Sequence, residues 1–162
     1  MRTLSEKKLR TKIRNWIILF IVFLILSGLT AFPLETEMTW LNGHSENFPE
    51  NLRLMIAKTS TSIHQTNLSY PELAYGTDWL AFAHIVIAMA FIGPLMNPVK
   101  NIWVIQFGMI ACIMVFPLAM IAGPIRHIPF YWRMIDCSFG VFGFFPLLIT
   151  YKYIKQLEFI RT

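Results

Sequence analysis

Four long apolar runs, joined by short polar connections, constrain the fold of this chain more than any other feature of its sequence. The runs cover residues 16–34, 79–96, 102–122 and 137–152. A helix of about 20 apolar residues crosses the hydrocarbon core of a bilayer and satisfies its own backbone hydrogen bonds there. Because 56% of the 162 residues are hydrophobic, ordinary soluble domains are excluded. The sequence predicts an all-α integral membrane protein, with four transmembrane helices bundled in one domain of residues 1–162.

The first and last runs each raise a question about the extent of their helices. The first run follows a basic segment, residues 1–14, and reaches Leu29-Thr30-Ala31, a combination that also fits a cleaved signal peptide. We expect a retained membrane anchor instead. The last run is short for a full crossing, so we expect its helix to extend beyond the run at one or both ends.

The distribution of charge predicts an orientation. With the N-terminus inside, ten of the 14 Lys and Arg lie in the cytoplasmic segments 1–14, 97–101 and 152–162, and seven of the nine acids lie outside. This matches the positive-inside rule, so we predict that both termini are cytoplasmic. Compactness and topology indicate a multi-pass protein of a bacterial inner membrane. Since topology accounts for the net charge of +5, we expect no nucleic-acid partner.

The segment 35–77 differs in kind from the runs and is predicted to be an external loop. Its five glutamates outnumber its two basic residues. Within it, residues 51–67 are predicted to form a short amphipathic helix, since apolar positions recur at steps of three and four. These positions are Leu52, Met55, Ile56, Thr59 and Ile63. Beyond the loop, Thr77 and Asp78 are expected to cap the helix that starts at Trp79.

Small side chains predict where the helices touch, because close backbone approach holds membrane helices together. One stripe in the third run consists of Gly108, Cys112, Val115, Ala119 and Gly123. Ala81, His84 and Ala88 share a face of the second run, and Gly140 and Gly143 lie three residues apart in the fourth. We interpret these as packing seams, with His84 pointing into one of them. Pro117 is expected to kink the third helix.

The connection between the third and fourth runs, GPIRHIPFYWRMID at 123–136, is unusually rich in polar and aromatic residues. A charge near hydrocarbon is costly unless it is paired or reaches water, so these side chains need an explanation. We predict that they meet polar groups of the second helix just beneath the outer membrane surface. The candidate ligand-binding residues are Asp78, His84, Arg126, His127, Arg133 and Asp136.

Two interpretations of this cluster stay open. In the first it is structural: Arg133 pairs with Asp136 three residues away, and Arg126 meets Asp78 or a lipid phosphate. Tyr131 and Trp132 are then ordinary interfacial anchors. In the second interpretation the cluster is a pocket for an anionic lipid headgroup, a carboxylate or an acidic segment of a partner, which arginine binds through two parallel hydrogen bonds.

Catalytic and cofactor chemistry has weaker support. His84 and His127 could ligate haem b in a four-helix bundle, and Asp78 or Asp136 with either histidine could serve acid–base catalysis. The four histidines match no metal-ligand spacing, and the two cysteines form no C-x-x-C. We therefore expect no catalytic residues, metal or cofactor. The predicted role is a non-enzymatic accessory or interaction subunit, or a binder of an anionic lipid-like ligand. Its expected partners are the lipid bilayer, other membrane subunits or a second copy.

Overall fold

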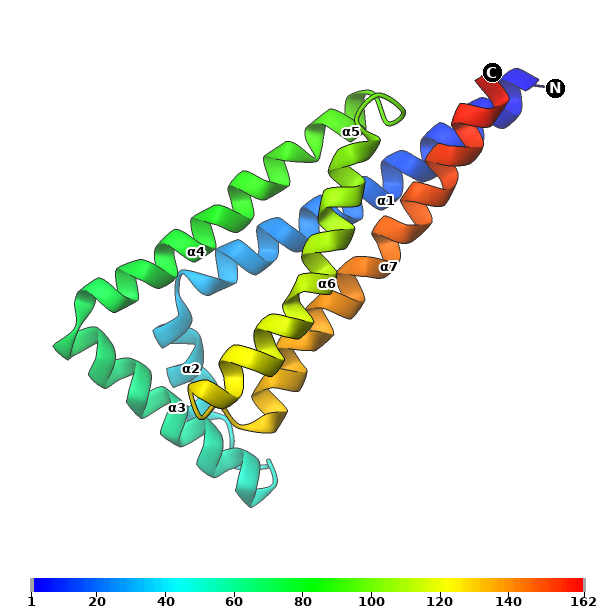
Figure 1. Cartoon of the computed structure of the whole chain (residues 1–162). Helices are drawn as coiled ribbons and strands as arrows, with labels where there is room; N and C mark the ends of the chain where they lie inside the picture. Colours follow the sequence, from blue (N-terminus) through cyan, green and yellow to red (C-terminus); the bar gives the residue numbers. More distant parts are fainter. Residues whose placement is uncertain (1, 162) are drawn as a thin grey trace. The chain divides into compact units, whose positions relative to one another are not determined.

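The computed structural model describes the backbone of residues 2–161 and the side chains of residues 5–160. Met1 and Thr162, which the predicted domain includes, lie outside the described residues. Within residues 2–161 all regular structure is helical and no strand occurs. The helices of this described part (Figure 1) are α1 (Arg2–Ala31), α2 (Leu34–Gly43), α3 (Glu50–Ser69), α4 (Pro71–Ala90), α5 (Ile92–Met96), α6 (Ile102–Ile125) and α7 (Phe130–Arg161).

Among the described residues, four helical stretches are long and apolar enough to cross a membrane, judged by length and composition. They are Ser5–Ala31, Pro71–Met96, Ile102–Ile125 and Phe130–Ile160. The prediction of four spans in an all-helical multi-pass membrane protein is thereby confirmed at this level. The fourth helix extends past both ends of the apolar run 137–152, as its short length required.

Two predicted helix boundaries are wrong, and a proline explains each. The first span does not reach residue 34, because α1 ends at Ala31 and Pro33 precedes a separate helix, α2, which the sequence analysis did not predict. Pro33 has no N–H to donate to the preceding turn. Asp78 does not cap a helix starting at Trp79. It lies inside α4, which begins at Pro71, a residue suited to the first helical position.

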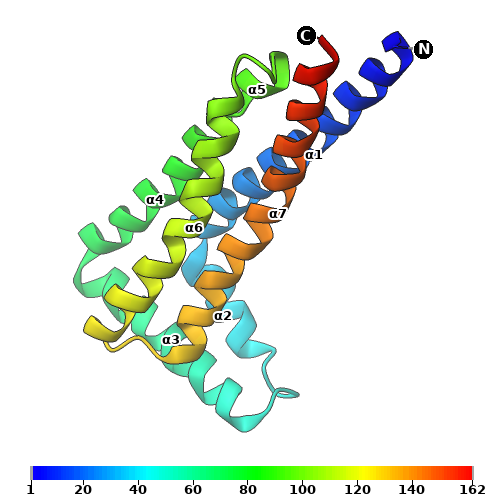
Figure 2. The ribbon, with the colours of Figure 1, turned by 45° about the vertical axis from the view of Figure 1, so that its right-hand side comes forward.

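Contacts group the chain into two compact units. The first, here the α6–α7 unit, contains the residues up to Phe23 and those from Ala88 onward. The second, the α2–α3 unit, contains Leu24–Ile87. In the α6–α7 unit, the two helices that name it make the most extensive contact and lie side by side in Figures 1 and 2. Its core includes Ile17, Phe91, Ile105, Leu147 and Leu157, all fully buried.

Glycines bring the backbones of α6 and α7 together. A Cβ placed on Gly140 would lie 2.6 Å from the Cys112 carbonyl oxygen, and one placed on Gly143 would lie 3.0 Å from the Cys112 Sγ. A Cβ on Gly108 would lie 2.8 Å from both Leu147 and Phe91. The predicted small-residue stripe is therefore a real contact face. Helix α6 continues through Pro117 to Ile125.

The α2–α3 unit contains two contacts of its own. Helix α2 packs on α3, whose predicted inner face includes the buried Ile56. The end of α1 meets α4 at Gly28, where a Cβ would lie 2.7 Å from the Ala81 carbonyl oxygen and 3.2 Å from the His84 Cβ. The predicted face with Ala81 and His84 is thus a packing face, and its partner is α1.

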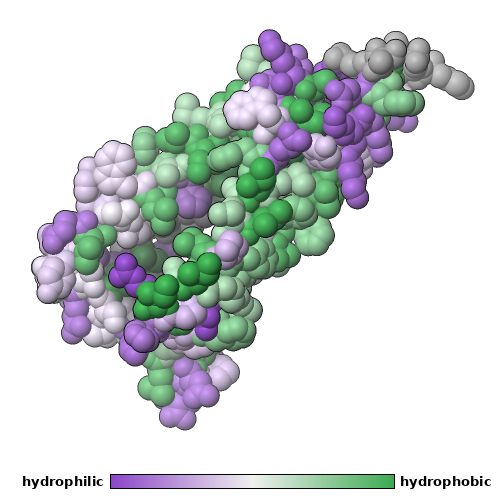
Figure 3. Space-filling view, viewed as in Figure 1, coloured by the Kyte–Doolittle hydropathy of each residue, from purple (hydrophilic) through white to green (hydrophobic). Residues whose placement is uncertain are grey.

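The surface of the α6–α7 unit is mostly apolar. Hydrophobic residues cover α6 and α7 along their middle portions, and hydrophilic residues gather toward the N-terminal part of α1 and the end of α7 (Figure 3). Large apolar side chains such as Ile121 and Phe142 are well exposed. An exposed apolar band of this kind suits a lipid surrounding, which agrees with the four candidate spans.

Candidate functional site at the α6–α7 turn

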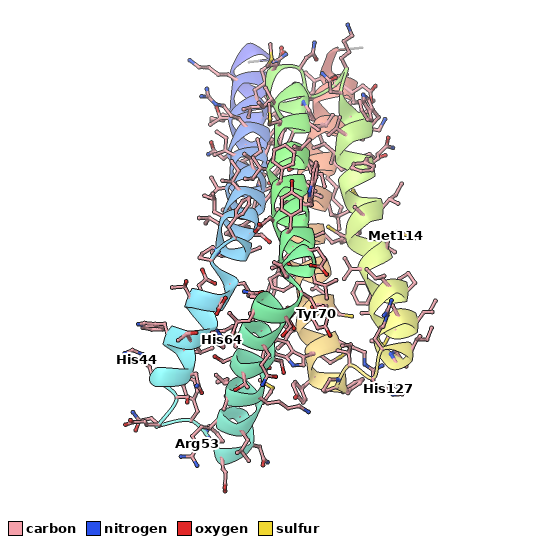
Figure 4. All side chains as sticks on the ribbon, turned by 90° about the vertical axis from the view of Figure 1, so that its left-hand side faces the viewer. His44, Arg53, His64, Tyr70, Met114 and His127 are labelled. Carbon is pink, nitrogen blue, oxygen red and sulfur yellow. The ribbon has the colours of Figure 1, made fainter. Side chains whose placement is uncertain are left out.

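Helix α6 ends in a compact cap that fixes the start of the turn. The Ile128 N–H donates to the Gly123 carbonyl at 2.8 Å, and the His127 N–H donates to the Pro124 carbonyl at 3.0 Å. This pair of bonds defines a Schellman cap, whose central residue adopts a left-handed conformation. His127 occupies that position with φ 56° (Figure 4). Glycine is usual there, so the histidine costs about 1 kcal/mol of backbone strain.

Arg133 is held against the end of α6 by its own side-chain stem. Its backbone N–H donates to the Pro129 carbonyl at 3.3 Å, in the first turn of α7. The stem fills the space left by Gly123, where a Cβ would overlap the Arg133 Cγ and Cδ. The guanidinium carbon lies 5.3 Å from the centroid of the Phe130 ring, a favourable cation–π distance. Gly123 and Phe130 therefore fix where this positive charge sits.

The charge of Arg133 has no acidic partner among the described residues. Its Nε is buried and finds no hydrogen-bond acceptor there. The three-residue spacing suggested an ion pair between Arg133 and Asp136, but no such pair forms among the described residues. Asp136 is exposed on α7. A buried donor without an acceptor costs about 1–3 kcal/mol. The described residues therefore offer this guanidinium no ion-pair partner.

Arg126 adds a second cation to the same turn. It caps α6, and its N–H donates to the Ala122 carbonyl at 3.0 Å. Its side chain is exposed. A cation at this position is favoured by the negative end of the helix dipole. Arg126, His127 and Arg133 therefore belong to one short stretch of the α6–α7 unit.

Asp78 and His84 lie in the α2–α3 unit, so the predicted meeting of all six candidate residues stays a prediction. His84 Nδ1–H donates to the carbonyl of Leu80 one turn earlier, at 2.8 Å. Together with the contact at Gly28, this bond gives His84 a packing role in the seam between α1 and α4. The suggested haem ligation by His84 and His127 likewise stays a prediction. Over the described residues, no group of three or more His, Cys, Asp and Glu could hold a metal ion.

The α2–α3 unit also contains an open pocket, with both polar and apolar lining residues, that sequence analysis missed. The pocket has a volume of about 480 Å³ and is lined by the junction of α1 and α2 and by parts of α3 and α4, including Glu35, Thr66 and Asp78. Glu35 accepts hydrogen bonds from His64 Nδ1 at 2.6 Å and from Asn67 Nδ2 at 2.5 Å. Figure 4 shows His64 on α3 beside α2.

The hydrogen bonds to Glu35 stabilise its charged form. They lower the pKa of this carboxyl below its ordinary value of 4.5, with the His64 bond as the largest cause and the Asn67 bond as the next. Glu35 is 29 residues from His64 and 32 from Asn67, so no local spacing could have signalled this contact. Its structural effect is to tie the first turn of α2 to α3.

The fold and this site define a helical multi-pass membrane protein. At the turn between its last two spans, an arginine is held in place by Gly123 and Phe130 and has no acidic partner among residues 5–160. Comparisons with protein-family models, with curated proteins and with solved structures find no match.

Proposed function

We propose that this protein is a four-pass protein of a bacterial inner membrane, with both termini cytoplasmic, that binds an anionic lipid-like ligand without transforming it. The binding site is the α6–α7 turn, on the outer side of the membrane in this orientation. The positive-inside distribution of Lys and Arg supports that orientation. In this orientation Arg126 and Arg133 are two of the four basic residues on the outer side, against ten inside.

The observation that carries the proposal is the state of Arg133. Its stem is packed against Gly123, its Nε is buried, and no carboxylate of the described residues pairs with it. An ionised side chain at the edge of a membrane span is kept only where some group offsets its charge. A phosphate or carboxylate at the membrane surface supplies that charge and accepts two parallel hydrogen bonds from a guanidinium.

Several neighbours complete the proposed site. Arg126 contributes a second guanidinium from the end of α6, and His127 is held beside it by the helix cap. Asp136 remains a proposed contributor, suited to the polar or cationic part of a headgroup, and the involvement of Asp78 and His84 stays a prediction. We further propose that the protein works as an accessory subunit, in contact with other membrane proteins or with a second copy.

Lysine substitution of the two arginines tests the proposal, because lysine keeps the charge but cannot form the two-pronged hydrogen bond. Arg133→Lys and Arg126→Lys would be purified in mild detergent and incubated with phosphatidylglycerol or with zwitterionic phosphatidylcholine. Native mass spectrometry then gives the fraction of protein carrying each lipid. Arg53→Lys, an exposed arginine of α3, is the matched control.

We expect Arg133→Lys to lower the preference for phosphatidylglycerol by about three- to tenfold, a loss typical of one ordinary hydrogen bond, because lysine keeps the charge. The effect of Arg126→Lys should be smaller, because its side chain is exposed, and Arg53→Lys should match wild type. If wild type shows no preference between the two headgroups, the proposed function is wrong. An absorption spectrum of the same preparation tests the haem alternative through its Soret band.

A further inference from the structure

A second feature of the α6–α7 unit is a narrow apolar groove between the two helices, away from the turn. Its volume is about 240 Å³. The lining residues are Cys112, Ile113 and Phe116 of α6 with Gly140, Val141, Phe144 and Phe145 of α7. The groove is open at its rim, where Ile113 and Phe145 are more than half exposed.

We propose that this groove holds one acyl chain of the anionic lipid whose headgroup binds at Arg133. The inference rests on the proposed function and deepens it, because it makes the ligand a long-chain anionic lipid and excludes a free anion. A groove on a candidate span is surrounded by hydrocarbon, so its occupant is apolar. The groove's volume of about 240 Å³ is also smaller than the space that one turn of a helix occupies, since a helix measures about 10–12 Å across with its side chains.

The distance along α7 between Arg133 and the groove allows a single lipid to occupy both. Seven residues separate Arg133 from Gly140, which corresponds to about 10 Å at 1.5 Å per residue. Half of a hydrocarbon core is about 15 Å thick, so a chain that leaves a headgroup at Arg133 reaches the depth of the groove. Headgroup and chain of one lipid therefore span the two features.

An apolar stripe of α7 runs from the turn toward the groove. Steps of four, three, four and four residues place one stripe on a single face of α7. The stripe consists of Phe130, Met134, Cys137, Val141 and Phe145. Its first member is the ring on which the Arg133 guanidinium lies, and its last two members line the groove. The stripe contains no charged residue, although Cys137 in its middle is buried and does not reach the surface.

Gly140 brings the two helices close together beside the groove. Gly140 lies so close to Cys112 that a Cβ would be 2.6 Å from the Cys112 carbonyl oxygen, whereas the flanking Phe116 and Phe144 are bulky. The groove lies beside this close approach, and its lining includes the aromatic rings of Phe116, Phe144 and Phe145. Packing of methylene groups against such rings contributes many small dispersion terms, which liquid-like lipid on a smooth helix surface does not supply.

The test compares chain lengths at constant headgroup. Dioctanoyl- and dioleoyl-phosphatidylglycerol would be titrated onto the purified full-length protein, with native mass spectrometry as the readout. The groove is filled by Val141→Trp and, from the other helix, by Ile113→Trp. Phe142→Trp is the matched control, because it adds a tryptophan at the neighbouring position, which is outside the groove lining and 71% exposed.

We expect wild type and Phe142→Trp to prefer the long-chain lipid by about fivefold or more, since the short chain ends before the groove is filled. Val141→Trp and Ile113→Trp should reduce this preference to less than about twofold while keeping the preference for phosphatidylglycerol over phosphatidylcholine. That combination supports the groove as the chain site.

Other outcomes separate the two proposals. A headgroup preference with no difference in chain-length preference between wild type and Val141→Trp overturns the groove and leaves the headgroup site intact. A mass of two protein chains without bound lipid, lost in Val141→Trp, overturns the groove as a lipid site and assigns it to a second copy. Absence of any headgroup preference in wild type removes the proposed function and this inference with it.

Discussion

Substitution of Gly140 by alanine provides the sharpest test of how α6 and α7 pack. The Cβ of an alanine at this position would lie 2.6 Å from the Cys112 carbonyl oxygen and 3.3 Å from the Phe116 ring. The nearest atom is backbone, so no side-chain rotation can relieve the overlap. Ordinary van der Waals contact begins at 3.4 Å, and the helices must therefore separate locally by about 0.8 Å.

The size of the effect follows from this displacement. A gap of about 0.5–1 Å removes roughly a quarter to a half of the dispersion energy at each contact it opens. Insertion of one carbon into a well-packed interface typically costs about 1–3 kcal/mol. Because the clash meets backbone in the most extensive helix contact of the protein, we expect Gly140→Ala to lower the free energy of unfolding by about 2 kcal/mol.

The assay is SDS-induced unfolding of the purified protein in mixed micelles, followed by far-UV circular dichroism. Two glycines serve as graded controls. A Cβ on Gly108 would meet only side-chain ends of Phe91 and Leu147, which can shift, so a smaller loss is expected there. A Cβ on Gly76 would meet nothing within 4 Å, and alanine is the better helix former, so Gly76→Ala should be neutral or slightly stabilising.

The order of the three variants decides the outcome. If Gly140→Ala unfolds at the same SDS concentration as Gly76→Ala, the close approach of the α6 and α7 backbones is not what stabilises this pair. If Gly108→Ala is more damaging than Gly140→Ala, side-chain packing around Phe91 outweighs the backbone contact, and the reasoning from Cys112 is wrong.

Three further predictions concern single residues. The lowered pKa of Glu35 contributes stability that is present above its unfolded pKa of about 4.5 and is lost as the pH falls through the lower folded value. The amide-exchange protection of α2 should therefore drop in acid in the wild-type protein, and it should drop much less in Glu35→Gln. His127→Gly should raise the free energy of unfolding by about 1 kcal/mol in the SDS titration, because glycine adopts φ 56° without strain; a loss of stability would show that the imidazole makes a compensating contact. Gly123→Ala should displace the Arg133 stem and lower phosphatidylglycerol retention, as measured by native mass spectrometry, whereas Gly76→Ala should retain wild-type binding.

The four candidate spans were predictable because each consists of a run of consecutive, mostly apolar residues. A run of apolar side chains of sufficient length needs no knowledge of its neighbours to become a membrane helix. The contact face of α6 was predictable for the same reason, because the spacing of small residues such as Gly108 and Gly123 within one helix indicates it. Which side chain fills each gap depends on the partner helix, and spacing within one helix does not contain that information.

Helix boundaries were less predictable because turn residues are ambiguous. Pro33 interrupts an apolar run that hydropathy alone extends to Leu34, and α2 then begins without a distinct periodic pattern. Asp78 follows Thr77, and this pair is a good capping sequence, yet Pro71 starts the helix earlier. Local capping preference is worth about 1 kcal/mol, which is too little to interrupt a helix that can already extend through the position.

The polar contacts were the least predictable part. Glu35 meets His64 and Asn67 only because α2 folds back on α3, and the three residues look unremarkable in isolation. Arg133 shows the converse: its spacing from Asp136 suggested an ion pair, but its stem lies in the space at Gly123 instead. Burial of the long apolar stem of an arginine competes with surface pairing, which contributes only a few tenths of a kcal/mol on a helix.

Gly123 and Gly140 lie on the same contact between α6 and α7, yet they serve different ends, and this permits stability and binding to be separated. At Gly140 the opposing atom is backbone, so a methyl group forces the helices apart. At Gly123 the opposing atoms belong to Arg133, so a methyl group moves a charged side chain and leaves the backbones in place. Gly140→Ala should therefore lose stability, while the protein that remains folded still prefers an anionic headgroup. Gly123→Ala should keep its stability and lose the preference for an anionic headgroup. If both variants lose stability equally and neither changes the headgroup preference, Gly123 is one more packing residue, and the position of Arg133 has no bearing on lipid binding.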